Sequence, residues 1–331
     1  MPAFPPAPEL ACQLLIPFAG ASAPACRAAL PGLRLPHLQA LLAELLLLAT
    51  DCGDEQRLSP PHERALAQAL GLRRADGSAC ADGQIPWAAA LSHSPTQPQA
   101  WFTPCHYAVG SEQVRLLPGD QIGLSDAESR ALCDALAPYC AEDGIELRFD
   151  SATRWHASGA ALRAVVCASL DRVSGCSLQG WMTESPANLS GRPLLQRLQS
   201  EAQLLFYSHP LHDARSARGL LPVNGFWISG AGALDQAPAL QPAPTQPAAL
   251  RWAALRADWA AWQQAWVQLD ATEIAAAHAA VRRGVPLQLS LCGERNTYTW
   301  ASAPRAVFAR MGRRLRQRLA PTPIHKTLEL L

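Results

Sequence analysis

Lysine is almost missing from this sequence, and neither sign of charge predominates. Lys326 is the only lysine, so 27 of the 28 basic residues are arginines, and 27 acidic residues leave a net charge of +1. A chain so close to neutral does not bind nucleic acid or an acidic membrane through bulk charge.

Long apolar runs are missing as well. The longest candidate, residues 38–49, is interrupted by Gln39 and Glu44, so no stretch reaches the 18 or so apolar residues of a membrane span. The start of the chain has no basic segment and carries four prolines in its first eight residues, which does not fit a secretory signal. We therefore expect a cytoplasmic protein that does not enter a membrane.

The common catalytic and cofactor signatures are absent too. The sequence has no GxxxxGK phosphate loop, no GxSxG nucleophile elbow and no HExxH zinc motif. Its ten cysteines include no CxxC pair, which excludes a zinc ribbon and a thioredoxin-type dithiol. We expect reduced, mostly buried thiols, with no cofactor, no metal and no catalytic residue assigned.

Two short patterns have a simpler structural interpretation. Gly230 and Gly232 follow a predicted strand, but a GxG without its third glycine favours a tight turn over a pyrophosphate site. His209 and His212 have a spacing that could serve a metal, yet a metal needs at least one further ligand from elsewhere. Hydrogen bonding at a helix end is the favoured role for both histidines.

What the sequence does contain is enough apolar material for a large core. Hydrophobic residues make up 49% and charged residues 17%, and 331 residues suggest about two domains. Helical and alternating patterns interleave irregularly, which predicts an α/β fold: mixed α and β, a sheet flanked by helices. Helices are expected at 37–50, 59–70, 125–141, 191–208, 252–269, 272–283 and 304–319. Ser125 and Glu128 have the spacing of a capping box at the start of the helix 125–141. Strands are expected at 12–19, 101–109, 113–117, 145–149, 154–157, 223–229, 285–292 and 296–301. Along the strand at 223–229, Val223 and Trp227 should share one face and Asn224 and Phe226 the other, after a loop that carries Arg215 and Arg218.

The predicted domain boundary is a proline-rich segment. Residues 235–249 carry four prolines and one charge, which predicts a linker or an extended surface loop. Residues 1–234 would form the main α/β domain, and 250–331 a smaller, mainly helical part arranged as helix, hairpin and helix. Trp252, Trp259, Trp262 and Trp266 share one face of the expected helix 252–269, which indicates core packing.

The last predicted helix, residues 304–319, is basic and amphipathic. Such a helix can contact nucleic acid or phosphate, and a solvated face of a capping helix explains it more simply. Nucleic acid therefore stays open as a partner only through this helix. Its arginines are Arg305, Arg310, Arg313, Arg314, Arg316 and Arg318.

The densest motif in the chain is residues 209–232, HPLHDARSARGLLPVNGFWISGAG. It resembles a segment of the archaeal-type cofactor-independent phosphoglycerate mutases. It is still more similar to a proteobacterial group labelled phosphoglycerate mutase or RpfE-type regulatory protein, which also fits LLIPFA, TPCHYAVG and EDGIELRFDSATRW. The resemblance to the proteobacterial group would cover most of the chain, whereas that to the mutases covers about 25 residues.

The resemblance to the mutases implies a two-metal phosphotransfer site, and this sequence departs from it. The family's first strand should carry an aspartate that binds metal, but CQLLIPFAG has no acid and the first aspartate in the chain is Asp51. The C-terminal region should add an Asp-x-x-x-His cluster, yet only His278 and His325 lie beyond His212. The metal-binding chemistry is therefore expected to be lost.

Five residues of the motif remain as candidates for binding an anion. Arginine suits anionic groups because its planar fork makes paired hydrogen bonds. An equally good explanation is that these residues tie a loop to the sheet. The candidates are His209, Arg215, Arg218, Asn224 and Trp227.

Two functions follow from the sequence. The favoured one is a cytosolic, non-catalytic regulatory or ligand-binding protein, a degenerate relative of cofactor-independent phosphoglycerate mutase. Its partner would be an anionic small molecule or another protein. The alternative is a phosphoglycerate mutase or a related phosphotransfer enzyme.

Overall fold

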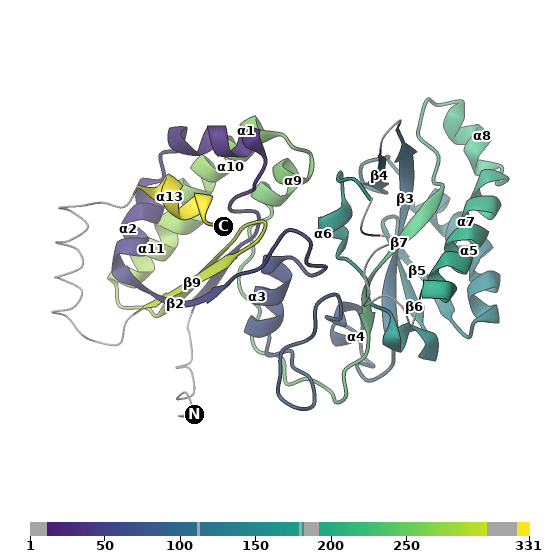
Figure 1. The fold of residues 1–331 in the computed structure, drawn as a ribbon, viewed down its shortest axis with the longest axis horizontal. Coiled ribbons are helices and arrows are strands. Elements are labelled where there is room, and N and C mark those ends of the chain that lie inside the picture. The colour runs from purple at the N-terminus through teal and green to yellow at the C-terminus, as the bar shows by residue number, and fades with distance from the viewer. Residues whose placement is uncertain (1–11, 111–112, 179–180, 182–191, 303–322) are drawn as a thin grey trace. The chain divides into compact units, whose positions relative to one another are not determined.

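The computed structural model describes residues 12–110, 113–178, 181, 192–302 and 323–331 (Figure 1). The chain forms two compact units. Unit 1 comprises Met1–Gln56, Pro60–Leu70 and Gln241–Leu331, and unit 2 comprises Arg57–Ser59 and Gly71–Leu240. The expected division at 235–249 differs from this one, because strands from both ends of the chain share a single sheet in unit 1.

The sheet of unit 1 has the strand order β1-β8-β9-β2. Strand β1 (Cys12–Ile16) runs parallel to β8 (Leu287–Cys292), and β9 (Thr297–Ser302) is antiparallel to both β8 and β2 (Leu45–Asp51). Apolar side chains that alternate along these strands pack against helices on one face, as a half-buried sheet requires. The expected hairpin at 285–301 is confirmed by the β8–β9 pairing.

The helices of unit 1 cover both faces of this sheet. α2, α10 and α11 contribute to the core that contains Leu14 and Leu289, whereas α3 contacts β1, β8 and β9 without joining that core. Helix α3 therefore lies on the opposite face. The helices are α1 (Pro24–Ala29), η1 (Leu30–Gly32), α2 (Pro36–Glu44), α3 (Pro61–Ala69), α9 (Ala249–Leu255), α10 (Trp259–Leu269), η4 (Asp270–Ile274), α11 (Ala275–Arg282) and α13 (Ile324–Glu329).

The prediction of one helix over residues 37–50 was wrong. The helix ends at Glu44, and the leucine run that follows becomes edge strand β2, paired with β9 from Leu45 to Asp51. Four consecutive leucines fit a helical or an extended period equally well, so the local pattern did not locate the break. Pairing with β9, which lies about 250 residues further along the chain, determines that these leucines form a strand.

The tryptophan-rich helix expected at 252–269 is also interrupted. α9 ends before Ala257, whose φ of 53° is left-handed, and the Asp258 side chain accepts a hydrogen bond from Ala261 N at 2.9 Å to start α10. Trp262 and Trp266 are fully buried as predicted, but Trp252 lies on α9 and is 42% exposed.

The proline-rich segment contacts the sheet of unit 1. Thr245 N donates to Gln13 O at 2.8 Å, and Leu15 N donates to Thr245 O at 2.9 Å. Pro244 beside it is buried. The segment is an extended surface loop whose middle is held by β1, so it is not a free linker throughout.

Unit 2 is built on a second, mostly antiparallel sheet. Its order is β4-β3-β6-β5, and β7 pairs with β3. All five strands were expected close to where they lie. They are β3 (Gln99–Val109), β4 (Val114–Pro118), β5 (Glu146–Ser151), β6 (Arg154–Ser158) and β7 (Gly225–Gly232).

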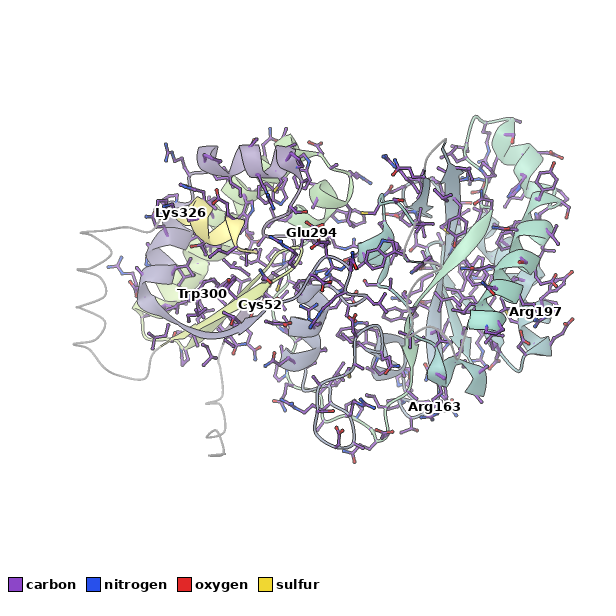
Figure 2. All side chains as sticks on the ribbon, in the orientation of Figure 1. Cys52, Arg163, Arg197, Glu294, Trp300 and Lys326 are labelled. Atoms are coloured by element: carbon purple, nitrogen blue, oxygen red, sulfur yellow. The ribbon has the colours of Figure 1, made fainter. Side chains whose placement is uncertain are left out.

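The long helices α5 (Asp126–Glu142) and α7 (Arg192–Tyr207) pack on one face of this sheet. The capping box predicted at Ser125 and Glu128 is present at the start of α5. Arg197 of α7, labelled in Figure 2, forms an ion pair with Asp143 just after α5. The short helices of unit 2 are α4 (Trp87–Ala90), η2 (Ala160–Ala164), α6 (Leu170–Val173) and α8 (Leu211–Ser216).

The mixed α/β class with helix-flanked sheets is confirmed, as is a helical contribution from the C-terminal residues. The basic helix expected at 304–319 lies outside the described residues. Within the described ranges, no helix is both long and apolar enough to cross a membrane.

Candidate functional site

Arg215, the central residue of the predicted anion motif, is directed into the protein. It lies on α8 and its side chain is completely buried. Nη1 donates to Glu128 Oε2 at 2.9 Å, Nη2 to Ile122 O at 2.7 Å and Nε to Leu221 O at 2.9 Å. The guanidinium therefore joins α8 to α5 and to two loops.

Arg218 contacts the same carboxylate from the surface. Its Nη2 donates to Glu128 Oε1, and its Nε donates to Ala214 O at 3.2 Å. Although burial opposes ionisation of Glu128, the Ser125 backbone N–H, Arg218, the Ser125 hydroxyl and Arg215 together lower its pKa to about 2. The Glu128 carboxylate thus accepts hydrogen bonds from two of the five predicted residues.

The side chains of the other three predicted residues also form hydrogen bonds within the protein. Asn224 accepts a hydrogen bond from Tyr107 N at 2.7 Å and donates one to Tyr107 O at 3.1 Å, which ties the motif to β3 as expected. Trp227 Nε1 donates to Ala168 O at 2.9 Å, and His209 Nδ1 accepts from Leu211 N at 3.2 Å. The five side chains do not converge on one site.

The predicted face pattern of this strand needs one correction. Phe226 and Ile228 join the core under α5 and α7, whereas Trp227 packs in the cluster on the other face, as alternation requires. Val223 was expected beside Trp227 but joins Phe226, because β7 begins only at Gly225. The segment with Arg215 is a short helix, where a loop was expected.

The histidine pair does not form a metal site with other residues. Burial lowers the pKa of His212, which favours its neutral form. Across the described part of the chain, no group of three or more His, Cys, Asp and Glu side chains is placed to hold a metal ion.

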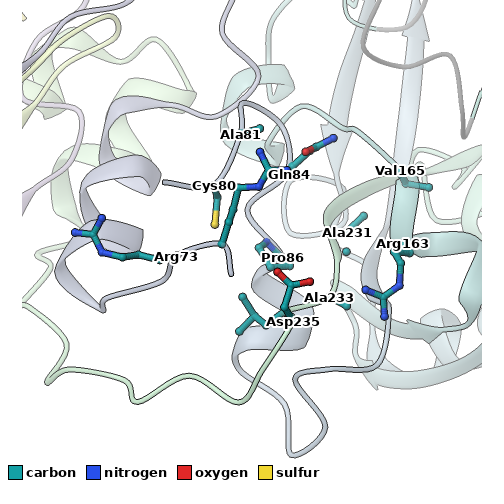
Figure 3. A pocket seen from close by; sticks show the side chains of 13 residues that line it. Arg73, Cys80, Ala81, Gln84, Pro86, Arg163, Val165, Ala231, Ala233 and Asp235 are labelled. Atoms are coloured by element: carbon teal, nitrogen blue, oxygen red, sulfur yellow. The ribbon is translucent and has the colours of Figure 1, made fainter. Parts of the chain in front are cut away.

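A cavity of about 280 Å³ lies where β7 ends, within unit 2 (Figure 3). Three arginines and a single carboxylate line it, so the charged side chains sum to 3 − 1 = +2. The lining residues are Arg73, Arg74, Cys80, Ala81, Gln84, Pro86, Arg163, Val165, Ala231, Gly232, Ala233, Leu234 and Asp235.

Small residues at the end of β7, Ala231, Gly232 and Ala233, line one side of the cavity. Gly230 and Gly232 both have positive φ, and a Cβ on Gly232 would lie 3.2 Å from the Cβ of Pro86. The two glycines therefore let β7 pass close to the segment that enters α4. The sequence favoured a tight turn here, whereas β7 continues through Gly232. The close approach also places residues 231–235 along one wall of the cavity.

The arginines of this cavity keep donors available. Arg73 Nη1 donates to Gly77 O at 3.1 Å and Arg163 Nη2 donates to Thr96 O at 3.2 Å, while the Arg74 guanidinium bonds to none of the described residues. All three side chains belong to exposed residues. A guanidinium has five N–H donors, so each retains several for a ligand.

Cys80 supplies a thiol to the same cavity. It is half-buried, and burial raises its pKa although Arg74 acts in the opposite direction. The neutral thiol is a poor nucleophile. The cavity residues escaped the sequence analysis because they come from three separate segments, and the adjacent Arg73 and Arg74 were the one local signal.

In unit 1, the carboxyl ends of the parallel strands β1 and β8 are filled by the chain itself. Ligands of open α/β sheets usually bind at such strand ends. Here Leu331 O accepts hydrogen bonds from Arg295 N at 3.0 Å and Asn296 N at 2.9 Å, and a Cβ on Gly20 would lie 2.6 Å from Leu328 O. Residues 324–331 thus pack against the ends of these strands.

Comparisons with known proteins leave the chain without an assigned family. No known protein family matches the sequence, and no curated protein matches it. Among solved structures, cofactor-independent phosphoglycerate mutase from Thermoplasma acidophilum is similar over 89% of both chains, with 10% identity and a TM-score of 0.33. PH0037 protein from Pyrococcus horikoshii is similar over 88% of this chain and 87% of its own, with 13% identity and a TM-score of 0.42. These values describe a distant similarity of fold and reveal nothing about activity.

Proposed function

We propose that this chain is a non-catalytic ligand-binding protein that takes a small anionic compound into the cavity at the end of β7. The observation that carries the proposal is the set of three arginines, Arg73, Arg74 and Arg163, around a cavity with one carboxylate. A regulatory role follows if ligand binding is the only chemistry of the chain.

Arginine side chains bind such an anionic ligand better than lysine side chains would. Each planar guanidinium can make two parallel hydrogen bonds to a carboxylate or a phosphate. Because these arginines are exposed, salt screens their attraction for the ligand, and affinity should fall as ionic strength rises. A cavity of about 280 Å³ suits a small metabolite rather than a nucleotide or a peptide.

The lining chemistry supports binding over turnover. The cavity offers one carboxylate and one thiol with a raised pKa, and neither a histidine nor a serine lines it. General acid–base or nucleophilic catalysis needs such groups in mutual contact. All ten cysteines are free, which fits the reducing cytoplasm in which we place the protein.

Protection of Cys80 tests the proposal. Inorganic phosphate is titrated at low salt while alkylation by iodoacetamide is followed by peptide mass spectrometry. Phosphate should slow alkylation of Cys80 and leave the exposed Cys52 and Cys176 unchanged, because only Cys80 lines the cavity. Equal rates with and without phosphate would contradict anion binding at this site.

A matched pair of variants tests whether phosphate binds in the cavity or is attracted by any exposed arginine. Arg163→Ala should weaken phosphate binding about tenfold, as expected for loss of one charge-assisted hydrogen bond. Arg148→Ala removes another exposed arginine of unit 2, one that pairs with Glu146 outside the cavity, and it should have no effect. The catalytic alternative predicts interconversion of 2- and 3-phosphoglycerate, and turnover that a chelator abolishes would overturn the non-catalytic assignment.

A further inference from the structure

We infer that the ligand of this cavity carries an ammonium group beside its anionic groups, and that it is an acidic amino acid. The inference rests on the proposed function and concerns the same cavity. It starts from Asp235, the one acidic residue of the lining, whose other charged residues are all arginines.

Asp235 is available to a ligand. Its Oδ2 accepts a hydrogen bond from Ala75 N at 3.1 Å, and Oδ1 has no partner among the described residues. Among the described residues, no ion pair joins Asp235 to any of the three arginines of the cavity. In the view of Figure 3 the Asp235 side chain lies among the labelled residues of the cavity, whereas the Arg73 guanidinium extends away from them.

A free carboxylate in such a position disfavours plain anions. It repels a phosphate or a dicarboxylate that the arginines attract, so a site built for a simple anion gains nothing from it. The same carboxylate attracts an ammonium group. Asp235 therefore sets specificity, and the arginines supply the main attraction.

An acidic amino acid matches the cavity charge by charge. Its two carboxylates complement the arginines, and its ammonium complements Asp235. The methylene groups between them can lie on Val165, Ala231 and Leu234, which are buried apolar residues of the lining. A molecule of this size also fits the volume of about 280 Å³.

Glutamate and glutarate test the inference, because they differ only in the amino group. Calorimetric titration of the full chain at low salt should show glutamate binding about fivefold more tightly, the upper range for one exposed ion pair. Asp235→Asn should abolish this preference. Its amide oxygen can still accept the hydrogen bond from Ala75 N, so the cavity wall is retained. The variant should also bind inorganic phosphate more tightly than the wild type does.

The outcomes separate this inference from the proposed function. If glutarate binds as well as glutamate, or if Asp235→Asn leaves the preference unchanged, the inference is overturned and anion binding stands. If phosphate binds but neither dicarboxylate does, the inference is again overturned. If no anion binds and Arg163→Ala changes nothing, the proposed function fails as well.

Discussion

The guanidinium of Arg215 and the carboxylate of Glu128 form a buried ion pair that joins α8 to the first turn of α5, with Nη1 2.9 Å from Oε2. Arg215 is fully buried and the Glu128 side chain is 9% exposed. Because Glu128 also completes the capping box with Ser125, the start of α5 and the conformation of α8 depend on the same carboxylate.

Removing Arg215 should therefore destabilise the fold. Arg215→Ala leaves Glu128 without its buried partner and two carbonyl oxygens, those of Ile122 and Leu221, without donors. We expect a loss of about 3–5 kcal/mol in the free energy of unfolding, the range for breaking one side of a buried ion pair. Urea denaturation measures it.

Arg218→Ala is the matched control for this change. It contacts the same carboxylate, but its side chain is 54% exposed, so the loss should stay below about 1 kcal/mol. Neither variant should alter phosphate binding in the cavity, because neither residue lines it. A stable Arg215→Ala protein that no longer binds phosphate would contradict this assignment of roles.

The same carboxylate predicts a pH dependence of stability. The pKa of Glu128 is about 2 in the folded chain and near its ordinary 4.5 when unfolded, so the unfolded state binds its proton first on acidification. The stabilisation is complete above about pH 4.5 and is lost as the pH falls toward 2. It is on the order of 3 kcal/mol.

Glu128→Gln isolates this contribution from that of other carboxylates. The free energy of unfolding of the wild type should fall more steeply between pH 4.5 and 2 than that of the variant. The difference between the two curves is the quantity to measure. Parallel curves across this window would show that Glu128 is not ionised more readily in the folded chain.

Local signals in the sequence predicted much of the fold. Ser125 and Glu128 located the start of α5, and alternation located β3 to β7 within a few residues. Segments whose conformation is set by distant partners were missed. The leucines of β2 become a strand only because β9 lies beside them, and the break at Ala257 carried no glycine or proline to mark it.

The candidate site was harder to predict than the fold. The sequence motif singled out Arg215 and Arg218, but whether an arginine binds a ligand or a buried Glu128 depends on residues about 90 positions away. The cavity brings together residues from 73–86, 163–165 and 231–235. No local pattern reveals such an assembly.

The extended loop at 235–249 should be cut by protease in its first part only. The residues at 236–240 are mostly exposed, whereas Thr245 is bonded to β1 on both its N–H and its carbonyl. Among described residues, elastase should therefore cleave first between 236 and 241. Mass spectrometry identifies the site, and early cleavage at 244–247 would show that the pairing with β1 does not persist.

A last prediction concerns the packing of residues 324–331 against the strand ends of unit 1. Gly20→Ala places a Cβ 2.6 Å from Leu328 O, so either the backbone at 20 or helix α13 must move. We expect a loss of about 1–3 kcal/mol, as for other overpacked sites. Gly32→Ala is the control, because its Cβ would approach nothing closer than 3.9 Å, and it should leave stability almost unchanged. Amide exchange gives a second readout, since Arg295 N and Asn296 N donate to Leu331 O and should lose protection only in Gly20→Ala. Equal stability and equal protection in both variants would mean that these residues do not close the ends of β1 and β8.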